Sequence, residues 1–233
     1  MKGTVVIIEK LIEKIDQKDA TQEVLSSPQS TSASLILELG GLAMRFARVE
    51  RTPRYEDGRR ESDVEHSYML ALVAPEVAHD LYPNEMNLGL ISQYAIVHDL
   101  VEVVTGDIPT FQLDEQTLAR KEANEQLALE KLLASLPPHT KKILAAYEAQ
   151  TDKEARFVRA TDKLLPIVTD IYGPGQRVMR EDYDVTTSQQ LHIAYERLRT
   201  RMQDRFGEFP GIITAYSLLS ELFEIEFSAT QQR

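Results

Sequence analysis

The residues most able to do chemistry lie in one apolar segment, residues 90–109. Aliphatic side chains surround this segment on most sides, which is typical of a buried helix. The same segment contains His98, Asp99 and Glu102. Burying an unpaired carboxylate is costly, so two carboxylates beside a histidine need a compensating partner. A divalent cation is such a partner, because imidazole nitrogen and carboxylate oxygen both bind it.

The positions of the polar residues along this segment indicate different roles for them. His98 and Asp99 can converge on one ion held between them, although neighbours on a helix diverge by about 100°. Glu102 lies one turn further along the same side, which suits acid–base work better than a bond to the ion. Asp107 follows the expected helix end and can reach back toward the same place. The alternative is a His–Asp pair in a buried hydrogen-bond network, and the cost of burial favours the metal.

Two ligands do not make a site, and the sequence offers two more. His66 opens an apolar helix and can face His98 across a helix pair. Asp162 lies among apolar neighbours in a helix expected over residues 153–172, so it too needs a partner. Lys163, beside it, can neutralise a bound phosphate or pair with an acid on the surface.

The remaining histidines do not extend this set. About 20 Å of helix separates His66 from His79, too far for the two to share an ion. We expect His79 to interact with a helix C-terminus, and His139 and His192 to lie at the surface.

Arginines gather within a short stretch of an otherwise acidic chain, at positions 45, 48, 51, 54, 59 and 60. Guanidinium groups bind phosphate with paired, planar hydrogen bonds. The stretch therefore favours a phosphate-binding patch, with Arg51 the best single candidate. The alternative is a solvated basic surface paired with Glu50, Glu56 and Asp57.

The elements that must position these residues are helices. Apolar residues recur at helical spacing almost throughout and no strand alternation is evident, which predicts an all-α fold. Residues 19–33 and 50–63 are read as polar loops, and Gly106 as the residue that ends the helix of His98. We expect helices over residues 5–15, 35–49, 64–81, 88–105, 114–136, 140–150, 153–172, 187–206 and 212–227. The predicted domains are an N-terminal helical arm with its linker (1–33), a helical domain (34–227) and a tail (228–233).

Composition excludes several classes of protein. The chain has 233 residues, no Cys, and 26 Lys and Arg against 37 Asp and Glu, a net charge of −11. Disulfides, thiolate metal sites and thiol catalysis are excluded. A strongly acidic chain repels nucleic-acid polymers and anionic membranes. No apolar run approaches the roughly 20 residues of a membrane span, and Val5–Ile8 is too short for a signal core. We therefore expect a cytoplasmic protein without a nucleic-acid or membrane partner.

The proposed ligands resemble a known signature. His66, His98-Asp99 and Asp162 match the H…HD…D pattern of the HD-domain metal-dependent phosphohydrolases. The segments RRESDVEHS and VHDLVEVVTGDIPT look like the 5′-deoxynucleotidase branch, which reads E-x-x-x-EHS and then HD-x-x-E-x-x-x-GD-x-P. The matching residues outside the ligand set are Glu61, Glu65, Ser67, Glu102, Gly106, Asp107 and Pro109. The resemblance covers about residues 35–170.

The resemblance implies roles for these residues. The four residues of the signature, His66, His98, Asp99 and Asp162, would bind one divalent metal, for which Mn, Co, Fe, Ni, Zn and Mg are candidates. Glu102 and Asp107 are similar to family residues that position the attacking water and handle protons. Arg51 matches an arginine that contacts substrate phosphate. Thr52 stands where the nucleotidase branch usually has an aromatic residue near the sugar. Two-metal relatives need further histidines soon after the HD pair, and only His139 and His192 follow here.

The sequence therefore predicts an HD-type helical bundle with an N-terminal arm and extra C-terminal helices. Its predicted function is release of phosphate from a small nucleotide, with a (deoxy)nucleoside 5′-monophosphate favoured. The alternatives are a dNTP or other phosphoester hydrolase of the superfamily, and a catalytically silent helical scaffold that keeps a structural metal. Glu102 and Asp107 argue against the scaffold, because a structural ion does not need them. Relatives commonly form homodimers, so a homodimer is expected.

Overall fold

The computed structural model describes residues 28–109, 111 and 115–230. The helix predicted over residues 5–15 lies outside these ranges. The chain divides into two compact units, residues 1–44 and 45–233. The fold is all-α apart from one short hairpin, as predicted.

Helix α3 spans Pro28–Phe46 and supplies the described part of the first unit. The loop predicted over residues 19–33 is therefore wrong for residues 28–33, and the predicted boundary after residue 33 falls inside a helix. The physical reason is the position of these polar residues. Pro and hydroxyl side chains are tolerated in a first helical turn, where the backbone N–H groups have no partner within the helix.

An antiparallel hairpin opens the second unit, in place of the polar connection predicted over residues 50–63. Strand β1 spans Glu50–Arg54 and β2 spans Arg60–Ser62. Gly58, in the turn between them, has a φ of 85°, which favours glycine. Arg51, Thr52 and Pro53 are all buried. A strand covered on both faces lacks the alternation of a half-exposed strand, so the pattern did not reveal it.

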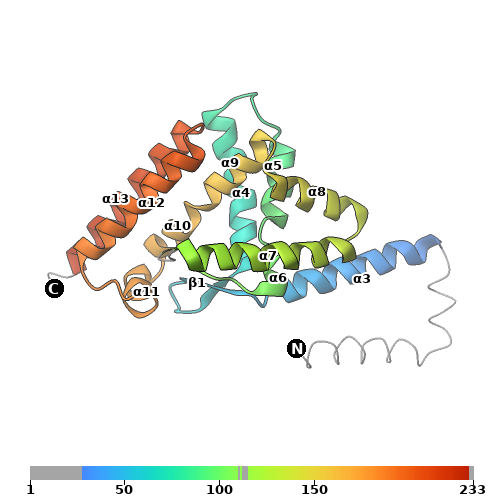
Figure 1. The fold of residues 1–233 in the computed structure, drawn as a ribbon, viewed down its shortest axis with the longest axis horizontal. Coiled ribbons are helices and arrows are strands. Elements are labelled where there is room, and N and C mark those ends of the chain that lie inside the picture. Colours follow the sequence, from blue (N-terminus) through green and yellow to red (C-terminus); the bar gives the residue numbers. More distant parts are fainter. Residues whose placement is uncertain (1–27, 110, 112–114, 231–233) are drawn as a thin grey trace. The chain divides into compact units, whose positions relative to one another are not determined.

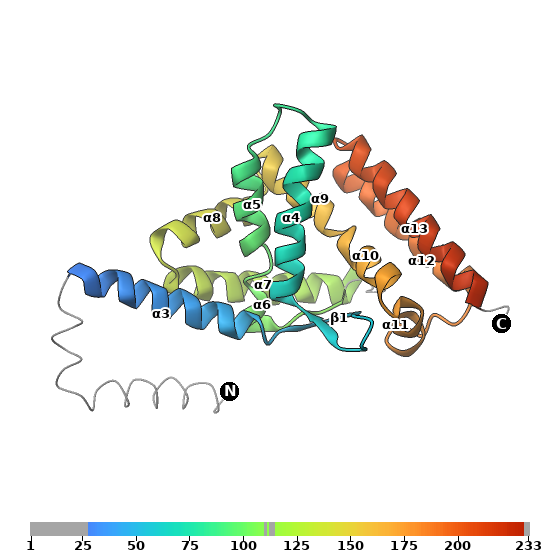
Figure 2. The ribbon, with the colours of Figure 1, turned by 180° about the vertical axis from the view of Figure 1, so that it is seen from behind.

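Three helices form the centre of the second unit: α4 (Asp63–Leu81), α5 (Leu88–Val97) and α9 (Lys153–Asp162). They pack against one another, as both ribbon views show (Figures 1 and 2). Every fourth residue of α4 is buried at His66, Leu70, Ala74 and Ala78. A stripe with this spacing faces one side of a helix, so His66 points the same way as the apolar residues that hold α4 in the core.

The helix predicted over residues 88–105 is interrupted. Residues 98–101 form a turn between α5 and the short α6 (Glu102–Thr105). The N–H of Leu100 donates to the carbonyl of Val97 at 3.1 Å, and that of Glu102 to Asp99 at 2.8 Å, which is the tighter three-residue spacing. Length and composition alone would allow Leu88–Thr105 to cross a membrane, but this break and its buried charged residues mark a core segment.

Gly106 is the end of a helix, as predicted, but of the short α6 and not of the helix before His98. Its φ is 74° and its N–H donates to the carbonyl of Glu102 at 2.8 Å. This left-handed residue turns the chain sharply and directs Asp107 to the site.

The helix predicted over residues 153–172 is also two helices, α9 and α10 (Leu165–Tyr172). Pro166 stands in the first turn of α10, and its ring disfavours continuation of the preceding helix. The break places Asp162 and Lys163 at a helix end, next to open space. The remaining helices are α7 (Glu115–Ser135), α8 (Pro138–Ala149), α11 (Gly175–Glu181), α12 (Ser188–Phe206) and α13 (Pro210–Thr230). Helices α12 and α13 pack side by side (Figure 1).

Candidate metal centre

Three helix ends bring the four proposed ligands to one place. His66 lies in the first turns of α4, His98 directly follows α5, and Asp162 is the last residue of α9. One ligand atom from each of His66, His98, Asp99 and Asp162 lies within 4.8 Å of the others. The structure thus gathers the four residues that the sequence singled out, which we call the His–Asp cluster; their binding of a metal stays a prediction.

The hydrogen bonds of His98 leave one of its ring nitrogens for a ligand. His98 Nδ1 lies 2.9 Å from the carbonyl oxygen of Ala95, which can only accept, so Nδ1 carries a proton. In the neutral ring Nε2 then keeps its lone pair; this atom is buried and has no hydrogen-bond partner among the described residues. It lies 2.9 Å from Asp99 Oδ2. Two lone pairs at this separation repel unless a proton or a metal ion lies between them. The donor set therefore fits a divalent cation.

His66 lies between two carboxylates. Its Nε2 lies 2.7 Å from Asp162 Oδ1, and its Nδ1 faces Glu61 Oε2 at 3.5 Å. A carboxylate on the far side of a ligating histidine orients the ring and raises its basicity. Glu61 is fully buried, and its other oxygen accepts the Thr169 hydroxyl at 3.2 Å.

The electrostatics also indicate a cation. Burial lowers the pKa of His98, but Asp99 and Asp162 outweigh it and raise that pKa to about 10. Burial raises the pKa of Asp162, yet Lys163 and the two histidines hold it well below its usual range. A proton on His98 can be replaced by a metal ion, which satisfies the same carboxylates.

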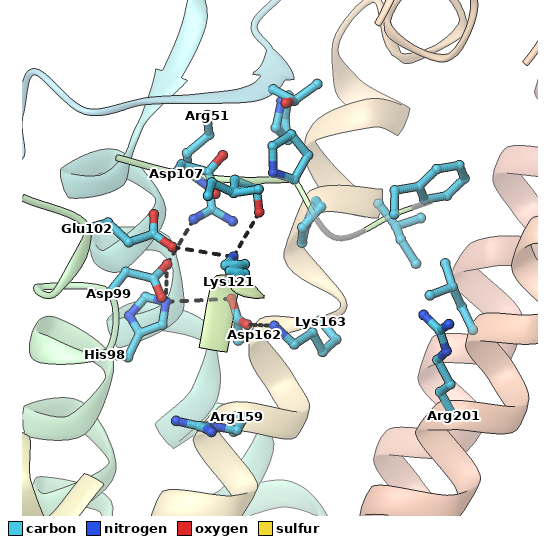
Figure 3. A pocket seen from close by; sticks show the side chains of 18 of the residues that line it. Arg51, His98, Asp99, Glu102, Asp107, Lys121, Arg159, Asp162, Lys163 and Arg201 are labelled. Carbon is cyan, nitrogen blue, oxygen red and sulfur yellow. Dashed lines mark hydrogen bonds and ion pairs between the residues drawn. The ribbon is translucent and has the colours of Figure 1, made fainter. Parts of the chain in front are cut away.

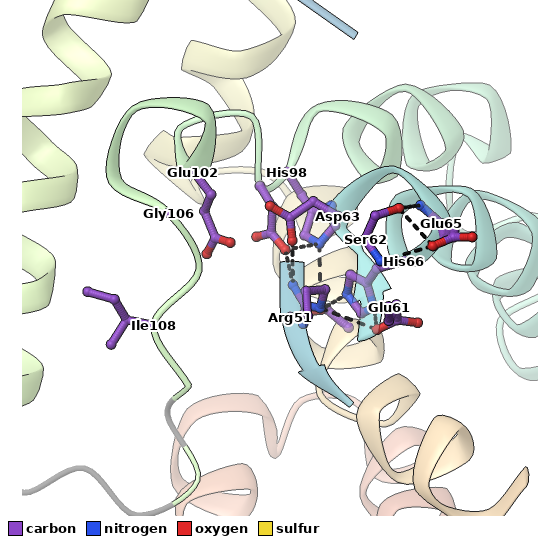
Figure 4. A network of polar contacts seen from close by, with 12 residues as sticks. Arg51, Glu61, Ser62, Asp63, Glu65, His66, His98, Glu102, Gly106 and Ile108 are labelled. Atoms are coloured by element: carbon purple, nitrogen blue, oxygen red, sulfur yellow. Dashed lines mark hydrogen bonds and ion pairs between the residues drawn. The ribbon is translucent and has the colours of Figure 1, made fainter. Parts of the chain in front are cut away.

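A second group of acids surrounds Arg51. Oxygens of Asp63, Asp99 and Glu102 lie within 4.8 Å of one another. The Arg51 guanidinium contacts Asp99 Oδ2 at 2.8 Å, Asp63 Oδ1 at 3.3 Å and Glu61 Oε2 at 3.4 Å (Figure 4). Arg51 already supplies positive charge to these acids, whereas the His–Asp cluster is the group whose donors fit a metal cation.

Buried acids around Arg51 repel one another. Burial, then Asp99, raises the pKa of Asp63 to about 7, against the opposing effect of Arg51. Burial, then Asp99 and Asp107, raises the pKa of Glu102 far above its usual range. Burial also raises the pKa of Asp107, although Arg51 and Lys121 oppose it. Glu102 can therefore hold a proton near neutral pH, and the pKa of Asp107 is shifted in the same direction, which suits acid–base work.

These groups open into one pocket with a volume of about 470 Å³ (Figure 3). Its walls include Arg51, Asp99, Glu102, Asp107 and Lys163, so every residue that the sequence proposed for catalysis or substrate binding lines it. Lys163 Nζ lies 2.7 Å from Asp162 Oδ2. Lys121 donates to the carbonyl oxygen of Ile108 at 2.8 Å, which fastens the segment that follows Asp107.

A family model described as "HD domain" matches residues 44–205, more than half of the chain. The chain belongs to the HD domain family. The family match extends past residue 170, where the resemblance visible in the sequence stopped. The His–Asp cluster of this HD domain stands where three of its helices end.

Relatives of this HD domain include the 5′-deoxynucleotidase YfbR of Escherichia coli. It is 30% identical over 128 residues, which are 52% of this chain and 64% of YfbR. The match thus spans less than two thirds of that relative's length. A crystal structure of a predicted metal-dependent phosphohydrolase from Magnetospirillum magnetotacticum superposes with a TM-score of 0.64 and 23% identity. It covers 88% of this chain and 98% of its own, and this likeness shows the fold.

The arginine patch predicted over residues 45–60 of the HD domain is largely wrong. Arg54 and Arg60 both contact Asp182 at 2.8 Å, and Arg59 contacts Glu65 at 2.8 Å. Of the six arginines, Arg51 lines the pocket. The acids proposed as alternative partners, Glu50, Glu56 and Asp57, form no ion pair with these side chains. Ion pairs with Asp182 depend on how a distant turn packs on the hairpin, which spacing along the chain does not reveal.

Other residues at the site escaped the sequence reasoning. Asp63 is fully buried beside Arg51, and its position two residues before the EHS motif was the available signal. Arg159, Asp170, Arg201 and Arg205 line the pocket and come from α9, α10 and α12. The other histidines lie apart: His79 and His139 are exposed, and His192 contacts Glu224 at 2.8 Å.

Proposed function

We propose that this HD domain protein is a metal-dependent phosphohydrolase that releases phosphate from a small nucleotide, with a (deoxy)nucleoside 5′-monophosphate favoured. The observation that carries the proposal is the meeting of two imidazoles and two carboxylates beside a buried arginine, with His98, Asp99 and Asp162 in the wall of a pocket. The name of the relative YfbR supports a nucleotide substrate.

His66, His98, Asp99 and Asp162 would hold one divalent cation. Their mixed nitrogen and oxygen donors suit Mn, Co, Fe, Ni or Zn, and Mg less well. When bound, a divalent cation lowers the pKa of a coordinated water and offsets the charge that builds on phosphate.

The protein's own groups have separate tasks in this proposal. Arg51, held by three acids, presents its guanidinium beside Asp99, where it can bind a phosphate oxygen through charge-assisted hydrogen bonds. Lys163 is placed at the same wall to bind another oxygen. Glu102 and Asp107 hold or move the protons of the attacking water and the leaving group.

The pocket wall suits a nucleoside. Thr52 lines it in place of the aromatic residue usual in the nucleotidase branch. Aromatic surface is provided instead by Phe111 and Tyr183, whose ring centroids lie 4.8 Å apart. Rings of this kind offer stacking and apolar contact to a base or sugar.

The experiment is phosphate release from a panel of nucleotides, each supplied with several divalent metals. We expect His98→Ala to lose both the bound metal and activity. Glu102→Gln keeps the metal and loses about 10²-fold or more of kcat, the range of general acid–base catalysis. His79→Ala, an exposed histidine, is the matched control. Full activity in both site variants contradicts the proposal. A bound metal without phosphate release from any nucleotide would favour the structural scaffold. The homodimer and the cytoplasmic location stay predictions.

A further inference from the structure

The pocket has two ends of different charge. At the end formed by the His–Asp cluster, acids crowd together and the cations Arg51, Lys121 and Lys163 are all engaged in ion pairs with them. Helix α12 forms the opposite wall and carries Arg201 and Arg205. Figure 3 shows Arg201 across the pocket from Asp99 and His98. We call these two arginines and the wall around them the α12 end.

The arginines of the α12 end differ from the other arginines of the pocket in their ion pairs. Within the described part of the chain, neither Arg201 nor Arg205 forms an ion pair, and Asp204, three residues after Arg201, makes none with it. Other arginines do find acids: Arg159 contacts Glu148 at 3.0 Å. The α12 end is thus a positive site in a chain whose net charge is −11.

The spacing of these arginines is unfavourable for the helix alone. Arg197, Arg201 and Arg205 follow one another at four-residue intervals. Like charges at this spacing repel and destabilise a helix. The repulsion is relieved when an anion binds between neighbouring guanidinium groups.

Helix α12 is firmly held, so the two arginines are presented in a defined place. Tyr195, Met202 and Phe206 are buried and also line the pocket. A capping box between Thr187 and Gln190 closes the start of the helix. Arg201 and Arg205 lie beside the buried residues of the helix and line the same pocket, and the Arg205 guanidinium lies 5.5 Å from the centroid of the Phe206 ring.

We propose that Arg201 and Arg205 form a second anion subsite, which binds a phosphate that the substrate carries away from its scissile 5′-phosphate. The proposal rests on the proposed function, because it places the 5′-phosphate at the His–Asp cluster. The favoured substrate class is a nucleotide with two separate phosphates. A nucleoside 3′,5′-bisphosphate and a 5′-phosphorylated dinucleotide share this chemistry, and both exceed a plain nucleoside 5′-monophosphate by one anionic group.

The experiment compares ligands with and without the second phosphate on the metal-loaded protein. The substrates are deoxyadenosine 5′-monophosphate, its 3′,5′-bisphosphate and the 5′-phosphorylated deoxyadenosine dinucleotide. Binding is measured separately with 5′-methylenephosphonate analogues of the three, in which carbon replaces the scissile oxygen. We expect the second phosphate to improve kcat/KM and Kd about tenfold at low salt, the range of a charge-assisted contact. Most of this gain is lost at high salt, because exposed charges are screened.

Variants assign the gain to the α12 end. In the double variant Arg201→Gln, Arg205→Gln the ratio between doubly and singly phosphorylated ligands falls to about one. Arg197→Gln is the matched control, since Arg197 lies on the same helix and is exposed but does not line the pocket. It keeps the ratio of the unchanged protein. The compound whose second phosphate improves kcat/KM and Kd more identifies which substrate fits, the 3′,5′-bisphosphate or the 5′-phosphorylated dinucleotide.

The outcomes separate this proposal from the proposed function. Equal binding of singly and doubly phosphorylated ligands overturns the subsite, and so does an equal loss for both in the double variant. A second outcome is that no compound releases phosphate, while the doubly phosphorylated analogues bind more tightly than the singly phosphorylated one and lose this advantage in the double variant. In that case the subsite stands and the proposed function fails.

Discussion

Asp170 offers a quantitative test of the electrostatics of this fold. This residue of α10 is 6% exposed, and its Oδ1 is buried without a hydrogen-bond partner among the described residues. Burial, and then the charge of Glu61, raise its pKa to about 8. In the unfolded chain an aspartate has a pKa of about 3.9. At a pH between these two pKa values, Asp170 holds a proton in the folded state that it has released in the unfolded state.

The sign of the effect follows from this proton. Where the folded state binds more protons, the free energy of unfolding falls as pH rises. The contribution is fully present below about pH 4 and is lost by about pH 8, at about 1.4 kcal/mol per pH unit. At pH 5 the free energy of unfolding has fallen by about 1.5 kcal/mol, and at pH 7 by about 4 kcal/mol. Both figures are upper bounds on the cost of burying the charged carboxylate.

Asp170→Asn removes the titration and keeps the shape of the neutral carboxyl. We therefore expect the variant to be more stable than the original protein, by an amount that grows from about 1.5 kcal/mol at pH 5 toward about 4 kcal/mol at pH 7. Urea unfolding at pH 5, 6, 7 and 8 measures both proteins. Asp80→Asn, at an exposed position, is the control and should change little. A stability difference that does not grow with pH refutes the reasoning.

Three further substitutions test local contacts. Gly173→Ala should cost about 1–3 kcal/mol, because its Cβ would overlap the backbone carbonyl of Arg54; Gly40→Ala, with open space around it, should cost nothing. Ser62→Ala should lower stability by about 1 kcal/mol in urea unfolding, since it breaks the capping box with Glu65 at the start of α4; an unchanged midpoint would contradict this. Arg51→Lys cannot keep three acid contacts. It should lower kcat/KM at least tenfold, which corresponds to a loss of about 1.5 kcal/mol of transition-state stabilisation, whereas Arg45→Lys should leave kcat/KM unchanged.

The sequence by itself determined the helical class and the candidate ligands. Apolar periodicity is a local property, so it survives without knowledge of the fold. The apolar neighbours of His98, Asp99 and Asp162 in the sequence likewise predict that these side chains are buried and need a partner. Gly106 was identified as a helix end because a left-handed residue there needs little from distant parts of the molecule.

Only the tertiary structure decided which charges meet. Arg54 and Arg60 pair with Asp182, more than a hundred residues away, and Asp63 and Asp99 join on Arg51. The helix breaks at residues 98–101 and 163–164, which aim the ligands, arise where helices end against one another. The placement of Arg201 opposite the His–Asp cluster belongs to the same category. Pairing between distant segments depends on how whole helices pack. That packing is determined by many core residues together and not by the residues next to the charged ones in the sequence.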